Sequence, residues 1–153
     1  MAIASRQGII VTAVLTCILY ITGIAVTLGL ILPTGKSNMS NPLTTHVLDT
    51  SIGKPANDLP IKLFYDTPNI GWKLLSEGKT NSDGRLPNLI TDPGTFVKGT
   101  YKLYFDTASY FKQQNITGFY PYVDIVFEIT SPGEHYHVPL LLNPYGYSTY
   151  RGS

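Results

Sequence analysis

Three histidines and one arginine are the side chains of this 153-residue chain best suited to chemistry near neutral pH. His135 and His137 stand two residues apart, and in an extended strand both imidazoles face the same side. His46 lies on the first predicted strand, and Arg85 follows an Asp83-Gly84 turn. Imidazole exchanges protons near pH 7, and a guanidinium offers a rigid set of donors to oxygen atoms. These residue types are capable of proton transfer and of binding a polar ligand, although an arginine near a turn is by itself more often a solvated charge.

Other interpretations of these side chains stay open at this point. A His-x-His pair on a strand can offer two nitrogens to a metal, but no Asp or Glu is clearly placed to complete the ligand shell, so we predict no metal. Each histidine taken alone is also consistent with a hydrogen-bonded or surface side chain. The chain has no Gly-rich phosphate loop, nucleophile elbow or HExxH motif.

The last twenty residues read EHYHVPLLLNPYGYSTYRGS and end at Tyr150, Arg151, Gly152 and Ser153. A terminus that frays is usually small, polar and tolerant of change. This one keeps aromatic residues and an arginine up to the last serine, so we expect it to lie in a site.

The elements that must position these residues are short strands separated by turns. Asp83-Gly84 is a strong hairpin signal, and Ala108–Gln114 predicts a short helix with Thr107 as its N-cap. Val123, Ile125, Phe127 and Ile129 alternate with polar residues, as in a strand with one buried face. The other predicted strands are Leu43–Thr50, Leu59–Tyr65, Trp72–Thr80, Thr100–Phe105 and Val138–Leu142. This spacing favours an all-β fold, an antiparallel β-sandwich with one short helix.

An apolar segment precedes this domain. Residues 8–32 carry no charge, and the run is longer than the ~20 residues needed to cross a bilayer. It also exceeds the ~7 to 15 residues of a typical signal-peptide core. We therefore predict an anchor or signal segment at 1–32, a linker at 33–42 and one domain at 43–153. A single-pass membrane-anchored protein is favoured, and a secreted or periplasmic protein after signal cleavage is the alternative.

Charge and cysteine content exclude several classes of function. The formal net charge is +1 and 14% of residues are charged, so no basic stripe is available for nucleic acid. The single cysteine, Cys17, lies in the apolar segment. Residues 43–153 therefore contain neither a disulfide framework nor a thiolate nucleophile.

Four motifs in the domain carry a family resemblance: LTTHVLDTSIGKPA near its start, SDGR in its middle, and HYHVPLLL and YGYSTYRGS at its end. With these motifs the chain resembles the transthyretin-like 5-hydroxyisourate hydrolases of urate degradation. The hormone carrier transthyretin shares the YST segment, but other residue types stand there at the positions of His46, Arg85 and His137. That carrier also continues past the position where YRGS ends this chain.

The resemblance implies a transthyretin-like sandwich of eight strands and one helix, assembled as a homotetramer around a central channel. It implies hydrolysis of 5-hydroxyisourate to 2-oxo-4-hydroxy-4-carboxy-5-ureidoimidazoline, with no metal or organic cofactor. By resemblance, the catalytic residues are His46, Arg85, His137 and Ser153, the substrate-binding residues are His46, Arg85 and Tyr150, and the supporting residues are His135, Arg151 and Gly152. The alternative is a small-ligand carrier without catalysis. A membrane-tethered adhesion module is a third reading, but it leaves YRGS unexplained.

Overall fold

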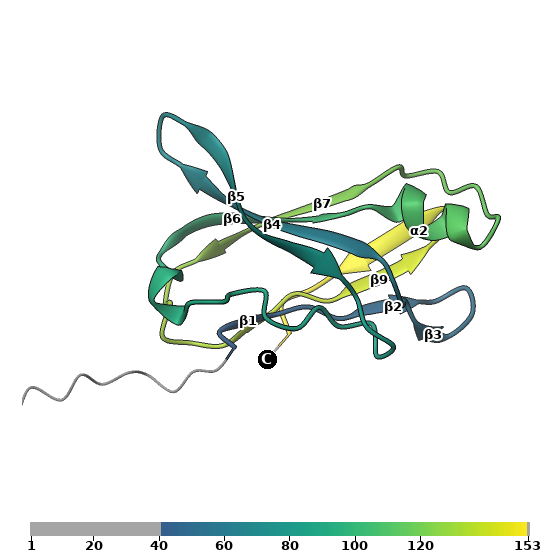
Figure 1. Cartoon of the computed structure of the whole chain (residues 1–153), viewed down its shortest axis with the longest axis horizontal. Helices are drawn as coiled ribbons and strands as arrows, with labels where there is room; N and C mark the ends of the chain where they lie inside the picture. Colours follow the sequence, from purple (N-terminus) through teal and green to yellow (C-terminus); the bar gives the residue numbers. More distant parts are fainter. Residues whose placement is uncertain (1–40, 153) are drawn as a thin grey trace, which may run out of the picture. The chain divides into compact units, whose positions relative to one another are not determined.

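Two four-stranded sheets form a sandwich in the domain (Figure 1). The computed structural model describes residues 41–152, so the predicted anchor or signal segment 1–32, the linker as far as residue 40, and Ser153 lie outside the described residues. One sheet has the order β10-β9-β2-β3 and the other β5-β4-β6-β7, while β1 and β8 form a short separate pair. The strands are β1 Leu43–Thr44, β2 Val47–Asp49, β3 Lys54–Pro55, β4 Pro60–Thr67, β5 Gly71–Lys79, β6 Gly99–Phe105, β7 Val123–Ile129, β8 Tyr136–His137, β9 Leu140–Asn143 and β10 Gly146–Thr149.

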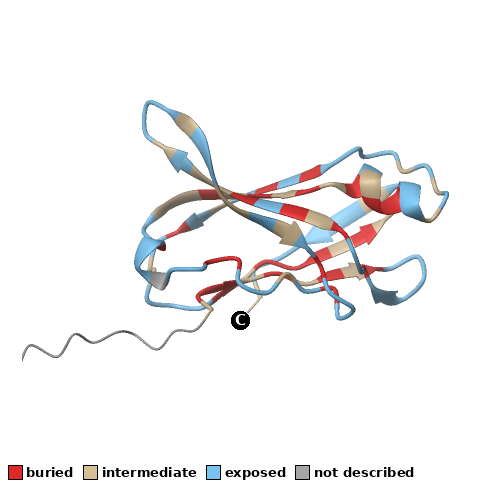
Figure 2. Cartoon of the chain, in the orientation of Figure 1, coloured by how far each residue is buried: buried red, intermediate tan, exposed pale blue. Residues whose placement is uncertain are grey.

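The core lies between the sheets and follows the alternation of the strands (Figure 2). In β6, Tyr101, Leu103 and Phe105 are fully buried and the residues between them are not. The predicted strands that correspond to β4, β5, β6 and β7 are confirmed to within one or two residues. The predicted sandwich with one short helix is therefore confirmed.

The prediction of a wholly antiparallel sandwich was wrong for two strand pairs. The first predicted strand, Leu43–Thr50, divides into β1 and β2, which run parallel to β8 and β9. All the strand pairs of the β5-β4-β6-β7 sheet are antiparallel. Parallel neighbours need a long connection, and here more than 85 residues lie between the paired segments. A local residue pattern does not report such a pairing.

The Asp83-Gly84 signal marks a turn, but the predicted hairpin was wrong. Asn81 Oδ1 accepts hydrogen bonds from the backbone N–H groups of Asp83 and Arg85, each at 3.0 Å. No second strand follows: residues 86–98 form a loop that contains only the 3₁₀ turn Pro93–Thr95. This loop instead contributes buried side chains to the core, among them Leu89 and Phe96.

The short helix α2 spans Thr107–Gln113, but its N-cap is Asp106 and not the predicted Thr107. Asp106 Oδ1 accepts a hydrogen bond from the Ser109 backbone N–H at 3.0 Å. Thr107 is fully buried, and its hydroxyl donates to the Tyr120 carbonyl at 2.6 Å. A stronger cap and a competing tertiary partner thus move the helix start by one residue.

The predicted membrane anchor falls on residues that the structure does not describe. Across 41–152, no helix has both the length and the apolar character needed to span a bilayer. At the predicted end of the linker, Pro42 is buried, and its carbonyl accepts a hydrogen bond from the Tyr136 N–H at 2.8 Å. The packed domain therefore includes Pro42.

Helix α2 is tied to β2 by one buried polar contact. The Tyr110 hydroxyl donates to Asp49 Oδ2 at 3.0 Å, and Asp49 is fully buried at the end of β2. Asp49 Oδ1 also accepts from the Ser51 backbone N–H at 3.0 Å. Burial, together with the hydrogen bond to Asp49, raises the pKa of Tyr110 to about 12. The phenol therefore remains a donor at all physiological pH values.

We predict that Tyr110→Phe lowers the free energy of unfolding by about 1–3 kcal/mol, because Asp49 stays buried and loses a donor. Urea unfolding followed by circular dichroism measures this change. Tyr145→Phe is the matched control, since Tyr145 is 76% exposed. Equal unfolding midpoints for the two variants would contradict the prediction.

Candidate active site

The parallel pairing places His46, Thr44 and His137 on the same face. Thr44 pairs with His137, and Val47 pairs with Leu140, so the two segments keep one register from β1–β8 to β2–β9. Thr44, His46 and His137 are all partly exposed, and Val47 is fully buried. Because side chains alternate along an extended chain, Thr44 and His46 point away from the core together. His46 and His137 therefore lie on neighbouring parallel segments and on the same face of them.

Gly84 brings Arg85 to this face. The Val47 N–H donates to the Gly84 carbonyl at 2.8 Å, and Gly84 adopts a φ of +70°. A Cβ at Gly84 would collide with the Val47 carbonyl oxygen and lie 3.2 Å from His46 Cδ2. Only glycine combines this backbone angle with so close an approach. The turn therefore carries the exposed Arg85 next to His46.

The C-terminal segment is attached directly to His137. The Gly152 N–H donates to the His137 carbonyl at 2.9 Å in an isolated antiparallel bridge. A Cβ at Gly152 would lie 2.6 Å from His137 Cδ2, so the backbone crosses the imidazole where only glycine fits. The C-terminal segment as far as Gly152 therefore lies beside His137, on the face that also carries Thr44 and His46. The predicted Ser153 lies outside the described residues.

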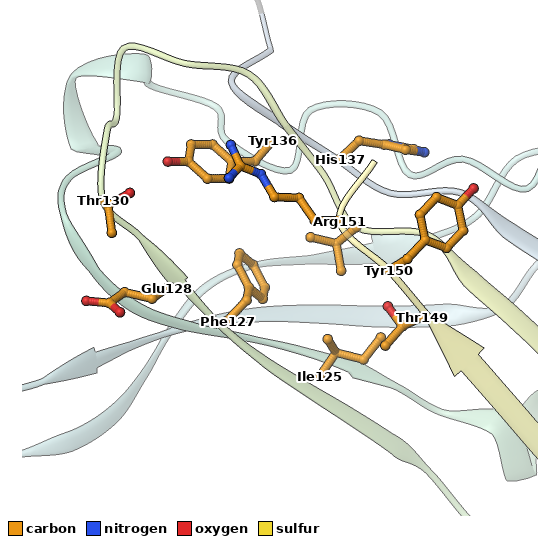
Figure 3. A pocket seen from close by; sticks show the side chains of 10 residues that line it. Ile125, Phe127, Glu128, Thr130, Tyr136, His137, Thr149, Tyr150 and Arg151 are labelled. Carbon is orange, nitrogen blue, oxygen red and sulfur yellow. The ribbon is translucent and has the colours of Figure 1, made fainter. Parts of the chain in front are cut away.

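Arg151 and Tyr150 line a pocket of about 400 Å³ beside His137 (Figure 3). The Arg151 guanidinium lies 5.0 Å from the Tyr136 ring centre and pairs with Glu134 at 3.3 Å. Tyr150 is 56% exposed. Apolar side chains, including Phe127, supply much of the remaining pocket wall. Arg151 therefore contacts Glu134 and Tyr136 at the edge of this pocket.

The electrostatics of the site favour neutral imidazoles. Burial lowers the pKa of His46 from its usual 6.5, and the nearby Arg85 charge lowers it further. Burial also lowers the pKa of His137, followed by the charges of Arg85, His135 and His46. Hydrogen bonds to the backbone of Asp83 and of Thr44, respectively, oppose these shifts. At pH 7 both rings are therefore mainly neutral and able to accept a proton.

Thr44 is the site residue that the sequence analysis missed. Its hydroxyl oxygen lies 2.8 Å from His137 Nδ1 and 3.1 Å from His135 Nε2. The short distances to both rings confirm that His135 and His137 face the same side. The available signal was position: Thr44 stands two residues before His46 on an extended segment.

The arrangement combines two proton acceptors with one fixed positive charge. Such a set can activate water beside a carbonyl group and stabilise the oxyanion that forms there. The Asp83 carboxylate also acts on His46 and opposes the lowering of its pKa, and Glu128 lines the pocket beside His137. With Arg85 as the fixed positive charge, the geometry fits attack by water on an oxygen-rich ligand.

Comparison with known proteins gives concordant matches. The HIUase/Transthyretin family model matches residues 43–152. The 5-hydroxyisourate hydrolase of Mus musculus is 51% identical over 115 residues, which cover 74% of this chain and 97% of that protein. The 5-hydroxyisourate hydrolase of Salmonella typhi is 43% identical over 114 residues, covering 74% of this chain and 82% of that protein.

Two solved structures are similar to the domain. A crystal structure of (S)-allantoin synthase is 38% identical with a TM-score of 0.67, covering 74% of this chain and 45% of that one. Sea bream transthyretin in complex with thyroxine is 34% identical with a TM-score of 0.68, covering 72% of this chain and 94% of that one.

We predict that Arg85→Gln raises the pKa of both His46 and His137, because it removes a positive charge that disfavours the imidazolium form. Titration of the imidazole signals by NMR measures the two values. Lys112→Gln, which removes an exposed positive charge on α2, is the control and leaves them unchanged. Unchanged pKa values in Arg85→Gln would refute the electrostatic coupling.

Proposed function

The chain belongs to the HIUase/transthyretin family, and from this premise we propose that it hydrolyses 5-hydroxyisourate at the face formed by His46, Arg85 and His137. Relatives named 5-hydroxyisourate hydrolase, including one from Rhizobium meliloti at 45% identity, support this activity. The observation that carries the assignment to this face is the meeting of two neutral imidazoles with one guanidinium. Three segments far apart in the sequence supply them.

The reaction opens a cyclic amide by addition of water. An imidazole takes a proton from water as the water oxygen bonds to the carbonyl carbon. The carbon–nitrogen bond then breaks, and the imidazolium returns the proton to the departing ring nitrogen. The acyl carbon becomes the carboxyl group of the product and the nitrogen becomes part of its ureido group. No external oxidant, reductant or cofactor is needed to balance this step.

Arg85 binds the oxygen-rich edge of the substrate in this proposal. A planar guanidinium donates hydrogen bonds in a fixed fork, which suits adjacent carbonyl oxygens of a planar heterocycle. The same charge stabilises the oxyanion formed when water adds. Its exposure and its place beside His46 leave the guanidinium open to a ligand.

His46 and His137 share the proton transfers. Thr44 occupies Nδ1 of His137, which leaves Nε2 as the nitrogen that can face water or substrate. Tyr150 and Ser153 are proposed to hold the substrate or the water in position. For Ser153 this proposal rests on the resemblance of the YRGS sequence.

The carrier alternative is not favoured. The transthyretin structure with thyroxine is 34% identical, whereas the mouse hydrolase is 51% identical over almost its whole length. A carrier for an aromatic ligand also has no need for two neutral imidazoles beside a guanidinium. Hydrolysis uses all three groups.

We predict that the chain accelerates the decay of freshly generated 5-hydroxyisourate, measured by its ultraviolet absorbance. His137→Asn lowers kcat by ~10²-fold or more if His137 transfers a proton. Lys112→Gln, remote on α2, is the matched control. Near-normal turnover in His137→Asn would remove the proposed role of His137. No acceleration by the folded wild-type chain would overturn the hydrolase assignment.

We further propose that the chain assembles as a homotetramer, which the transthyretin fold makes plausible. The face with His46, Arg85 and His137 is open to solvent in the single chain. A channel between copies would enclose this face and exclude bulk water. Size-exclusion chromatography with light scattering is expected to give four times the mass of the chain. An active monomer would contradict this assembly.

A further inference from the structure

The Thr44 hydroxyl joins two imidazoles on the candidate catalytic face. It lies 2.8 Å from His137 Nδ1 and 3.1 Å from His135 Nε2. A third neighbour, the Tyr136 carbonyl oxygen, can accept from this hydroxyl but is 3.5 Å away, at the limit of a hydrogen bond. The two imidazole nitrogens are therefore the principal partners of this hydroxyl.

A hydroxyl has one hydrogen to donate and two lone pairs that accept. If His137 carries its hydrogen on Nδ1, it donates to Thr44, and Thr44 donates its own hydrogen to His135 Nε2. His137 Nε2 then holds a free lone pair. In the reverse chain, His135 donates to Thr44 and Thr44 donates to His137 Nδ1, which leaves the hydrogen of neutral His137 on Nε2. Only the first arrangement leaves Nε2 able to take a proton.

The proposed function selects the first arrangement, because attack by water needs a lone pair on the ring nitrogen that Thr44 leaves free. A hydrogen bond to the Thr44 backbone raises the pKa of His137. Burial, the largest effect, and the positive charge of Arg85 outweigh it and lower this pKa, so the ring is mainly neutral at pH 7. A neutral ring carries one hydrogen, and when that hydrogen lies on Nδ1, 2.8 Å from the Thr44 hydroxyl oxygen, the free lone pair lies on Nε2.

We propose that Thr44 is a positioning residue. It accepts a hydrogen bond from Nδ1 of neutral His137, which holds that ring in the Nδ1–H tautomer, and it donates a hydrogen bond to His135 Nε2. This inference rests on the proposed function, because the tautomer matters when His137 accepts a proton from water. It also gives His135 a defined role, since His135 accepts a hydrogen bond from the Thr44 hydroxyl. The carboxylate next in sequence, Glu134, forms an ion pair with Arg151.

The test compares Thr44→Val, which removes the hydroxyl at similar volume, with Thr44→Ser, which keeps it. In the hydrolase assay, Thr44→Val is expected to lower kcat by about 10-fold with KM little changed, as for other partners that orient a catalytic imidazole. Thr44→Ser is expected to restore most of that loss. ¹⁵N NMR of the imidazoles at pH 8 reads the tautomer directly: Nδ1–H in the wild type and a mixture in Thr44→Val.

The NMR result separates this inference from the proposed function. An inactive wild type with the Nδ1–H tautomer would remove the hydrolase assignment and retain the role of Thr44 in setting the ring. A wild-type His137 with its hydrogen on Nε2 would overturn the inference, even if Thr44→Val failed to fold. A loss of kcat in Thr44→Val with an unchanged tautomer would also overturn it, because the hydroxyl would then act only through packing.

Discussion

The parallel register between residues 43–49 and 136–142 is the constraint on which the site depends. Thr44 lies opposite His137, and Val47 lies opposite Leu140, an offset of 93 residues in both pairs. A slip of one residue would turn every side chain of one segment to the other face. His46 would then point into the core, and the fully buried Val47 would enter water. The packing of the sandwich therefore fixes the alignment of the two histidines.

Two glycines convert this paired scaffold into a site. Gly84 presses its backbone against Val47 and His46, and Gly152 passes close to the His137 ring. A Cβ at Gly84 would collide with the Val47 carbonyl oxygen and approach Pro55 and His46, and a Cβ at Gly152 would collide with the His137 ring. The short motifs SDGR and YRGS thus contain glycine for a steric reason. Each glycine lies directly beside a residue of the proposed site, Arg85 or Arg151, and brings it close to a histidine.

The sequence predicts local features of this molecule better than its pairings. Strands β4, β6 and β7 of the second sheet follow from alternation, because each has one buried face, whereas β5 has no buried residue. The parallel pairs and the missing strand after Gly84 do not, since they depend on the return path of the chain. His46, Arg85 and His137 are predicted from their chemistry and the family motifs, and the structure brings them together. Thr44 is missed because threonine is common in strands and its role appears only with its partners in place.

Arg85 has two opposing effects on the proposed reaction. Its charge lowers the pKa of both imidazoles, which keeps them neutral but makes each a weaker base. The same charge stabilises the oxyanion that forms as the imidazole is protonated. Proton transfer and oxyanion formation create opposite charges together, so Arg85 repels one and attracts the other. The site is therefore suited to a concerted step, in which the Arg85 charge does not have to stand beside an isolated imidazolium.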